Sequence, residues 1–164
     1  MIYLASDHAG FKLKEAIKKF LIDQGKPVTD CGNTAYDPDD DYVDFIVQAS
    51  RKVAEHPDDD RAILFGGSGQ GEAMAANKVK GVRAAVFYGS HKPIGTVDAS
   101  GRVSDDPYEI VRLAHAHNNA NALSIAARFV TEQEAKEAIT AWLTTLFTNE
   151  KRHARRIKKI DEEM

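Results

Sequence analysis

The chain has 164 residues, which suits a single domain with a buried core, and its 43% hydrophobic and 29% charged residues are typical of globular proteins. A formal net charge of -3 gives no reason to expect nucleic acid as a partner, and no apolar run is long enough to cross a membrane. The start of the sequence lacks the pattern of a signal peptide, and a single cysteine, Cys31, excludes an internal disulfide. We therefore expect a cytoplasmic protein.

Apolar runs alternate with amphipathic stretches along the chain. Their spacing predicts, in order, a strand at 2–5, a helix at 11–21, a strand at 27–31, a helix at 42–53, a strand at 62–65, a helix from about 70, a strand at 83–87, a helix at 107–117, a strand at 122–126, a helix at 135–146 and a helical tail over about 149–164. Five strands alternating with helices predict a parallel sheet covered on both faces, a three-layer α/β/α sandwich. No domain boundary is visible, so residues 1–164 are expected to form one domain.

Three stretches follow predicted strands in a way that points to a site. Ser6-Asp7-His8 follows the first strand, and a glycine-rich loop follows the third strand. The remaining stretch is the segment after the fifth strand. Ligands of open α/β sheets bind outside the carboxyl ends of the strands. We therefore expect these stretches to form the site together.

The glycine-rich segment FGGSGQGEAMAANK (65–78) is the most informative of them. It lacks the Lys-Ser/Thr ending of a nucleotide P-loop, and Met74 stands where a dinucleotide fingerprint has its third glycine, so neither nucleotide cofactor is expected. It is either a tight strand-to-helix turn or a place where free amides hold an anion. Glu72 is then either a favourable first-turn residue or a base beside amides that stabilise an oxyanion.

Four segments, in this order along nearly the whole chain, resemble the ribose-5-phosphate isomerase B family: SDHAG (6–10), GGSGQGEAMAANK (66–78), HNNANALSIAAR (117–128) and RHARR (152–156). The resemblance implies a Rossmann-like fold and conversion of aldose phosphates to ketose phosphates through a cis-enediolate, with no cofactor and no metal. It also implies a homodimer or homotetramer with sites shared between subunits. The partners expected are thus a sugar phosphate and further copies of the chain.

One branch of the family uses a cysteine at the start of the glycine loop as its base, and another has a glycine there and a glutamate at the end of the loop. Gly66 and Glu72 make this sequence similar to the glutamate branch. The catalytic residues that the resemblance implies are Glu72, Ser68, His117, His153 and Asp7. The substrate-binding residues that it implies are His8, Tyr42, Gly67, Gly69, Gly71, Asn118, Arg128, Arg152 and Arg156.

The resemblance also implies a role for each group. Asp7 would contact sugar hydroxyls, His8 the phosphate region, and the amides of the glycine loop the anion. His117 would assist opening of the furanose ring, Asn118 would bind the intermediate, and the three arginines would bind phosphate. The helical tail would reach a partner subunit and bring His153 to ring opening there.

Ordinary structural interpretations compete with these roles. Asp7 and His8 could cap the first helix, and His117 could be a polar residue at a helix end. The basic run 151–159 could be a solvated helix face, and periodicity favours a core position for Tyr42.

Two features depart from the family pattern. Val43 stands where the family often has a proline, and the connection 88–107 looks longer than usual. Its segment VDASGRV (97–103) predicts a small hairpin. If the loop folds over the sugar, His91 or Lys92 would touch the substrate.

Three functions stay open at this point. The chain is a pentose-phosphate isomerase, an isomerase of a six-carbon sugar phosphate of the allose or galactose type, or a sugar-phosphate binding module without catalysis. The set Glu72, Ser68, His117 and Asn118 argues against the binding module, because binding alone needs no base.

Overall fold

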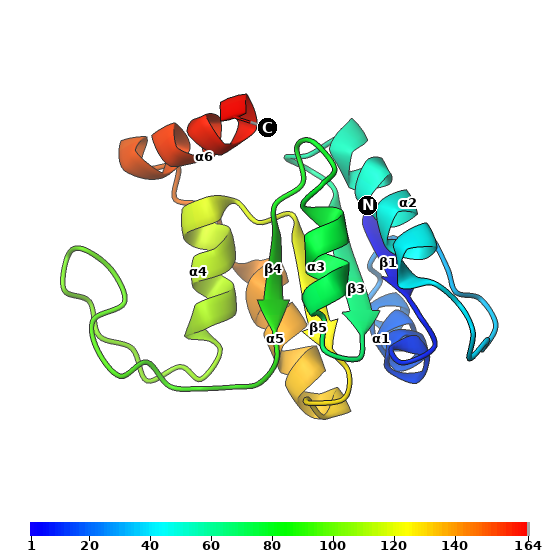
Figure 1. Ribbon diagram of the computed structural model, residues 1–164. Helices are drawn as coiled ribbons and strands as arrows, with labels where there is room; N and C mark the ends of the chain where they lie inside the picture. Colours follow the sequence, from blue (N-terminus) through cyan, green and yellow to red (C-terminus); the bar gives the residue numbers. More distant parts are fainter. Residues whose placement is uncertain (164) are drawn as a thin grey trace.

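The computed structural model describes residues 1–163, and Figure 1 shows a central sheet with helices packed around it. The elements are β1 (Ile2–Ser6), α1 (Phe11–Asp23), β2 (Val28–Asp30), α2 (Tyr42–Glu55), β3 (Arg61–Gly66), α3 (Gln70–Ala76), β4 (Ala84–Phe87), α4 (Glu109–Asn118), β5 (Ala122–Ala126), α5 (Glu132–Thr144) and α6 (Lys151–Glu163). All five predicted strands and all the predicted helices are confirmed. Within the described residues, no helix is both long and apolar enough to span a membrane.

The sheet is parallel throughout, with the strand order β2-β1-β3-β5-β4. Ser6 of β1 is in register with Phe65 of β3, and Gly66 of β3 is in register with Ala126 of β5. The loops after β1, β3 and β5 therefore leave the same edge of the sheet side by side. This is the arrangement that the sequence predicted for the site.

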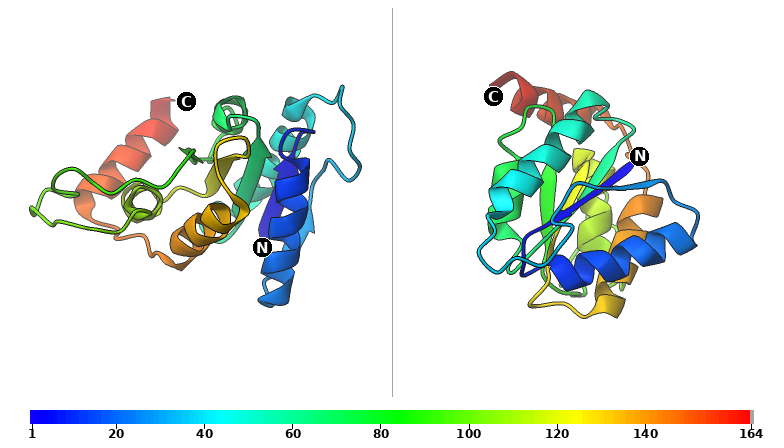
Figure 2. Two further views of the ribbon diagram at one scale, coloured as in Figure 1. Left: turned by 90° about the horizontal axis from the view of Figure 1, so that it is seen from below. Right: turned by 90° about the vertical axis from the view of Figure 1, so that its right-hand side faces the viewer.

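Alternate residues of each strand face opposite layers of helices. Ile63 and Phe65 pack with α1, α4 and α5 in one core cluster that includes the buried Trp142. Leu64, between them, packs with α2 and α3 in a second cluster on the other face. Figure 2 shows the helices on both sides of the sheet. The three-layer α/β/α sandwich is thus confirmed.

The end of α5 differs from the prediction, because the helix stops at Thr144 and does not continue to Leu146. The backbone becomes extended at Thr145, with φ -80° and ψ 142°. Both the amide and the hydroxyl of Thr148 then donate to the carbonyl oxygen of Ala116 in α4, at 3.0 and 2.9 Å. This contact leads the chain to α6, which packs against α4 near the edge where the strands begin (Figure 1).

The loop 88–107 contains no strand, and the predicted hairpin is reduced to a turn in which the amide of Val97 donates to the carbonyl oxygen of Arg102 at 2.8 Å. Side-chain bonds hold this turn. The carboxylate of Asp98 closes it, accepting hydrogen bonds from the amide and hydroxyl of Ser100 at 2.8 and 2.6 Å. Arg102 pairs with Asp98 at 3.1 Å and with Glu109 at the start of α4 at 2.6 Å. Side-chain bonds of this kind hold a turn without further strand pairing, and the backbone bond between Val97 and Arg102 crosses it.

A buried lysine, Lys14, ties α1 to the segment after β2. Its side chain is fully buried, and its ammonium donates to both carboxylate oxygens of Asp30 and to the carbonyl oxygen of Asn33, each at 2.7 Å. Lys18 also pairs with Asp30 at 2.7 Å but is partly exposed, so removal of Lys14 would take the fully buried cation from the carboxylate and the donor from the carbonyl oxygen of Asn33. We therefore expect this pair to contribute much more to stability than a surface pair does.

Lys14→Met should lower the free energy of unfolding by about 2 kcal/mol, because Asp30 keeps only the partly exposed Lys18 as a cationic partner and the carbonyl oxygen of Asn33 loses its donor. Lys19→Met is the matched control, since Lys19 is also on α1 but its pair with Asp23 is exposed and should matter little. Urea denaturation at pH 7 followed by circular dichroism measures both variants. Equal losses of stability would contradict the role given to Lys14.

Candidate active site

The glycine loop (66–71) joins β3 to α3 at the carboxyl edge of the sheet. Gly69, the residue before α3, has a φ of 72°, a conformation that favours glycine. The hydroxyl of Ser124 in β5 donates to the carbonyl oxygen of Gly69 at 2.7 Å, and amides after β5 donate to two further loop carbonyls at 2.8 and 3.2 Å. Ser68 lies exposed on the loop. The end of β5 thus fixes the shape of the loop.

Glu72 lies in the first turn of α3, as predicted, and only 4% of it is exposed. Its carboxylate turns back against the α-carbon of Gly66, so closely that a β-carbon on residue 66 would overlap its oxygens. Burial raises the pKa of Glu72, its own backbone amide lowers it, and the charge of Asp7 raises it further. A carboxylate whose pKa is raised towards neutrality is suited to accept a proton.

Four other predicted residues gather around the glycine loop. Asp7 is 8% exposed and accepts a hydrogen bond from the amide of Gly10 at 3.0 Å, so it also holds the turn before α1. The guanidinium of Arg128 and the hydroxyl of Tyr42 lie beside glycines of the loop. His8, next to Asp7, is close enough to Arg128 for their charges to interact. Among residues 1–163, no group of three histidine, cysteine, aspartate or glutamate side chains is placed to hold a metal ion.

A second group of predicted residues lies where the strands begin. The rings of His117, at the end of α4, and His153, in α6, stack with their centroids 4.2 Å apart and 11° between their planes. His153 is 5% exposed, and burial lowers its pKa, as does the nearby charge of His117. The other predicted residues on these two helices are Asn118, Arg152 and Arg156.

Within one chain, the structure separates the two groups. The sequence analysis assigned the helical tail with His153 to a partner subunit's site, but it did not separate His117 and Asn118 from Glu72. α4 leads from the carboxyl end of β4 to the amino end of β5, so His117 lies at the amino edge of the sheet (Figure 1). Glu72 lies beyond the carboxyl end of β3. A five-residue strand spans about 16 Å, so His117 and Asn118 do not reach Glu72 in the same chain.

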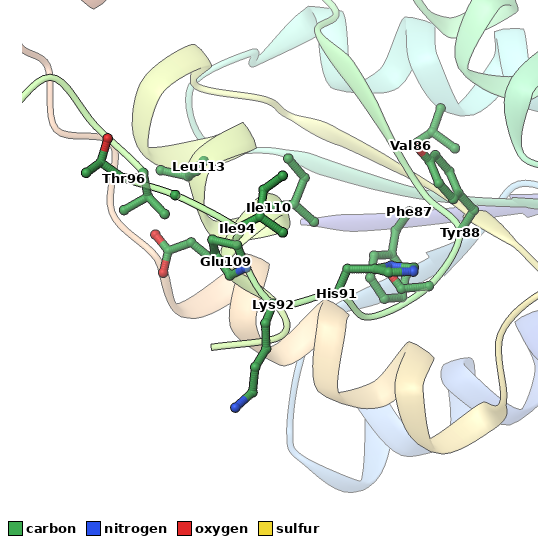
Figure 3. Close-up of a pocket in the computed structure, with 14 residues that line it drawn as sticks. Val86, Phe87, Tyr88, His91, Lys92, Ile94, Thr96, Glu109, Ile110 and Leu113 are labelled. Atoms are coloured by element: carbon green, nitrogen blue, oxygen red, sulfur yellow. The ribbon is translucent and has the colours of Figure 1, made fainter. Parts of the chain in front are cut away.

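The loop 88–107 runs along the outer side of β4 and α4 and does not cover the glycine loop. Figure 3 shows the groove of about 740 Å³ that it encloses with them. Ile94 and Ile110, both exposed, line this groove together with His91 and Lys92. Within one chain, His91 and Lys92 therefore face this groove, and the expectation that they touch a sugar bound at the glycine loop finds no support.

Comparison with known protein families matches residues 2–93 and 103–160 to the family described as ribose/galactose isomerase. The chain belongs to the ribose/galactose isomerase family. The nine unmatched positions, 94–102, fall in the loop after β4 and include the turn closed by Asp98. The long connection noted in the sequence thus departs from the family pattern.

Relatives in this family are similar over nearly their whole length. Ribose-5-phosphate isomerase B of Mycolicibacterium paratuberculosis is 38% identical over 161 residues, which cover 98% of this chain and 89% of that protein. The crystal structure of ribose-5-phosphate isomerase B from Mycoplasma genitalium with bound ribulose 5-phosphate has a TM-score of 0.85 at 37% identity and covers 99% of this chain and 94% of that one. The enzyme from Thermotoga maritima gives a TM-score of 0.82 at 34% identity, with 98% and 97% covered. The family resemblance and the Rossmann-like fold are confirmed.

Gly66→Ala should lower the free energy of unfolding by about 2 kcal/mol, because its methyl group overlaps the buried carboxylate of Glu72. This loss should largely disappear in a Glu72→Ala background, where the overlap is relieved. Gly67→Ala is the control, since its methyl group would come no closer than 3.4 Å to the Arg128 guanidinium. Urea denaturation of the four variants measures the coupling, and strictly additive effects would refute the close approach.

Proposed function

We propose that the protein is an aldose–ketose isomerase that interconverts ribose 5-phosphate and ribulose 5-phosphate without a cofactor, with Glu72 as the base. Membership of the ribose/galactose isomerase family supports the reaction class, and the names of the relatives support the pentose substrate. The observation that carries the choice of base is the buried carboxylate of Glu72, turned back on Gly66 beside the glycine loop.

In the proposed reaction, Glu72 removes the proton from C2 of the open-chain aldose. The electrons of the C–H bond form the C1=C2 double bond, and negative charge moves to the oxygen on C1. Amides of Gly67, Gly69 and Gly71 and the hydroxyl of Ser68 would stabilise this oxyanion, and Asp7 would hold sugar hydroxyls. Glu72 then gives the proton to C1 while a proton moves from O2 to O1, which yields the ketose.

The second group of residues is proposed to complete this site from another copy of the chain. His117 and His153 would assist ring opening there, and Arg152 would bind the phosphate together with Arg128 of the first chain. Asn118 and Arg156 belong to the same group. The support is geometric, because the two groups lie at opposite edges of the sheet in one chain and a second copy can bring them together.

The outer edge of β4 is the surface proposed for this contact. The groove with Ile94 and Ile110 follows the carboxyl half of β4, and a smaller groove near Ile160 of α6 follows its amino half. Exposed apolar side chains that lie together in this way favour association with another protein surface. A homodimer formed here, alone or within a tetramer, would carry the α6 helix of one chain towards the partner's site.

A six-carbon sugar phosphate is the second candidate substrate, because the family description names galactose as well as ribose. Purified protein should be assayed against ribose 5-phosphate, allose 6-phosphate and galactose 6-phosphate, with a chelator present. Turnover of ribose 5-phosphate at the highest kcat/KM supports the proposal. Turnover of none of them would favour a binding module.

Glu72→Gln should lower kcat by about a hundredfold or more, because the amide keeps the size of the side chain but cannot accept the proton. Binding of a sugar-phosphate analogue should survive, and calorimetry measures it. Cys31→Ala is the control and should keep wild-type turnover, since Cys31 follows β2 and takes no part in the proposed site. An active Glu72→Gln beside a folded but inactive Cys31→Ala would refute the assignment of the base.

Mixed dimers test the shared site. Glu72→Gln and the double variant Arg152→Ala/Arg156→Ala should each be weakly active alone, because every site carries one defect. After mixing of subunits at equal amounts, half the dimers are mixed and each has one intact site, so activity should recover to about a quarter of wild type. Native mass spectrometry confirms the mixing. Mixed dimers without recovered activity, or a fully active monomer, would contradict shared sites.

A further inference from the structure

The acidic loop 35–41 between β2 and α2 contains one aspartate that differs from its neighbours. Asp37, Asp39 and Asp41 are exposed, as solvated loop residues should be. The side chain of Asp40 is only 4% exposed and points inward, towards the segment that follows β1. A nearly buried carboxylate among exposed ones calls for specific partners.

Asp40 uses both carboxylate oxygens. Oδ1 accepts a hydrogen bond from the backbone amide of His8 at 3.0 Å and lies 2.7 Å from Nδ1 of the same residue. Oδ2 accepts a hydrogen bond from the side-chain amide of Asn33 at 2.7 Å. Asn33 is itself buried, and its carbonyl oxygen accepts from the ammonium of Lys14. The position of the carboxylate is therefore fixed through Asn33, which lies in the segment after β2 and is itself bound by Lys14 of α1.

The contact with Asp40 determines which nitrogen of the His8 ring is free to bind a ligand. Because Asp40 occupies Nδ1, only Nε2 is left to reach a substrate at the carboxyl edge of the sheet. The side chain of His8 is 31% exposed, so Nε2 is accessible to a ligand of the size of a phosphate. The paired carboxylate also favours the doubly protonated ring, which donates from both nitrogens.

The charges around His8 act in both directions. The hydrogen bond to Asp40 raises the pKa of His8, and the charge of Asp7 adds to this increase. Burial and the charge of Arg128 lower it, but the net direction is upward. The pKa of Asp40 is lowered by its bonds to Asn33 and His8 despite its burial. The imidazolium is therefore kept to a higher pH than that of a free histidine.

We propose that Asp40 is a positioning residue, which acts through His8 by holding the ring with Nε2 towards the phosphate of the substrate and by keeping it protonated for that anion. This proposal rests on the proposed function only for the identity of the anion. The contact between Asp40 and His8 is independent of it.

Asp40→Asn tests the proposal, with Asp39→Asn as a control that removes a charge from the same loop. The pKa of His8, measured by NMR titration of its ring Cε1–H signal, should fall in Asp40→Asn and stay unchanged in Asp39→Asn. The KM for ribose 5-phosphate at pH 7.5 should rise about tenfold in Asp40→Asn at nearly constant kcat. At pH 5.5 the difference in KM between the two proteins should be smaller, because a larger share of His8 is then protonated in Asp40→Asn, while the loss of ring positioning remains.

An unchanged pKa of His8 in Asp40→Asn would overturn the proposal, and so would a KM that rises equally at both pH values, since a merely structural role gives that result. Asp40→Glu should restore part of the raised pKa of His8 if the carboxylate acts through the ring. If the wild type turns over no sugar phosphate, the proposed function fails. The NMR titration of His8, repeated with inorganic phosphate as the ligand, then still decides the role of Asp40.

Discussion

The approach of the Glu72 carboxylate to the α-carbon of Gly66 is the contact on which the rest of the site depends. It exists because residue 66 has no side chain and because α3 starts within one turn of that residue. In the cysteine branch of the family, the base stands at the position of Gly66. Side chains at both positions would overlap here, so this chain has room for only one of the two side chains.

The same close packing affects how readily the Glu72 carboxylate accepts a proton. The Glu72 carboxylate is buried, and the charge of Asp7, which acts on its pKa, is also negative. Both effects make the ionised form less favourable and the carboxylate a stronger base. Gly10 allows a second close approach, since a β-carbon there would lie 2.5 Å from the backbone of Phe65. The segment that carries Asp7 is thereby held against the end of β3.

Much of this could be predicted from the sequence, because the elements follow local rules. Apolar periodicity located the strands and helices, and the glycine run located the start of α3 and the place of Glu72 in its first turn. α2 begins at Tyr42 even though Val43 replaces the usual proline. The loop after β4 was less predictable, because bonds from Ser100 to Asp98 hold its turn and the loop contains no strand.

Two further features could not be predicted from composition. Asp40 is one of three successive aspartates, and only its contacts with His8 and Asn33 distinguish it from the others. The placement of His117 follows from topology, because a helix that leads into a parallel strand ends at the amino edge of the sheet. The sequence motif around His117 does not by itself show at which edge of the sheet this residue lies. In the proposed function, the two groups of predicted residues share a site through a second copy of the chain.

The central claim is that Glu72 carries the proton at C2, and hydrogen exchange at that carbon tests it most directly. Ribose 5-phosphate should be incubated with the protein in D₂O and followed by proton NMR. The account predicts that the wild type replaces hydrogen at C2 with deuterium, and that Glu72→Gln, with the sugar phosphate still bound, loses this exchange together with turnover. Exchange at the wild-type rate in Glu72→Gln would contradict it.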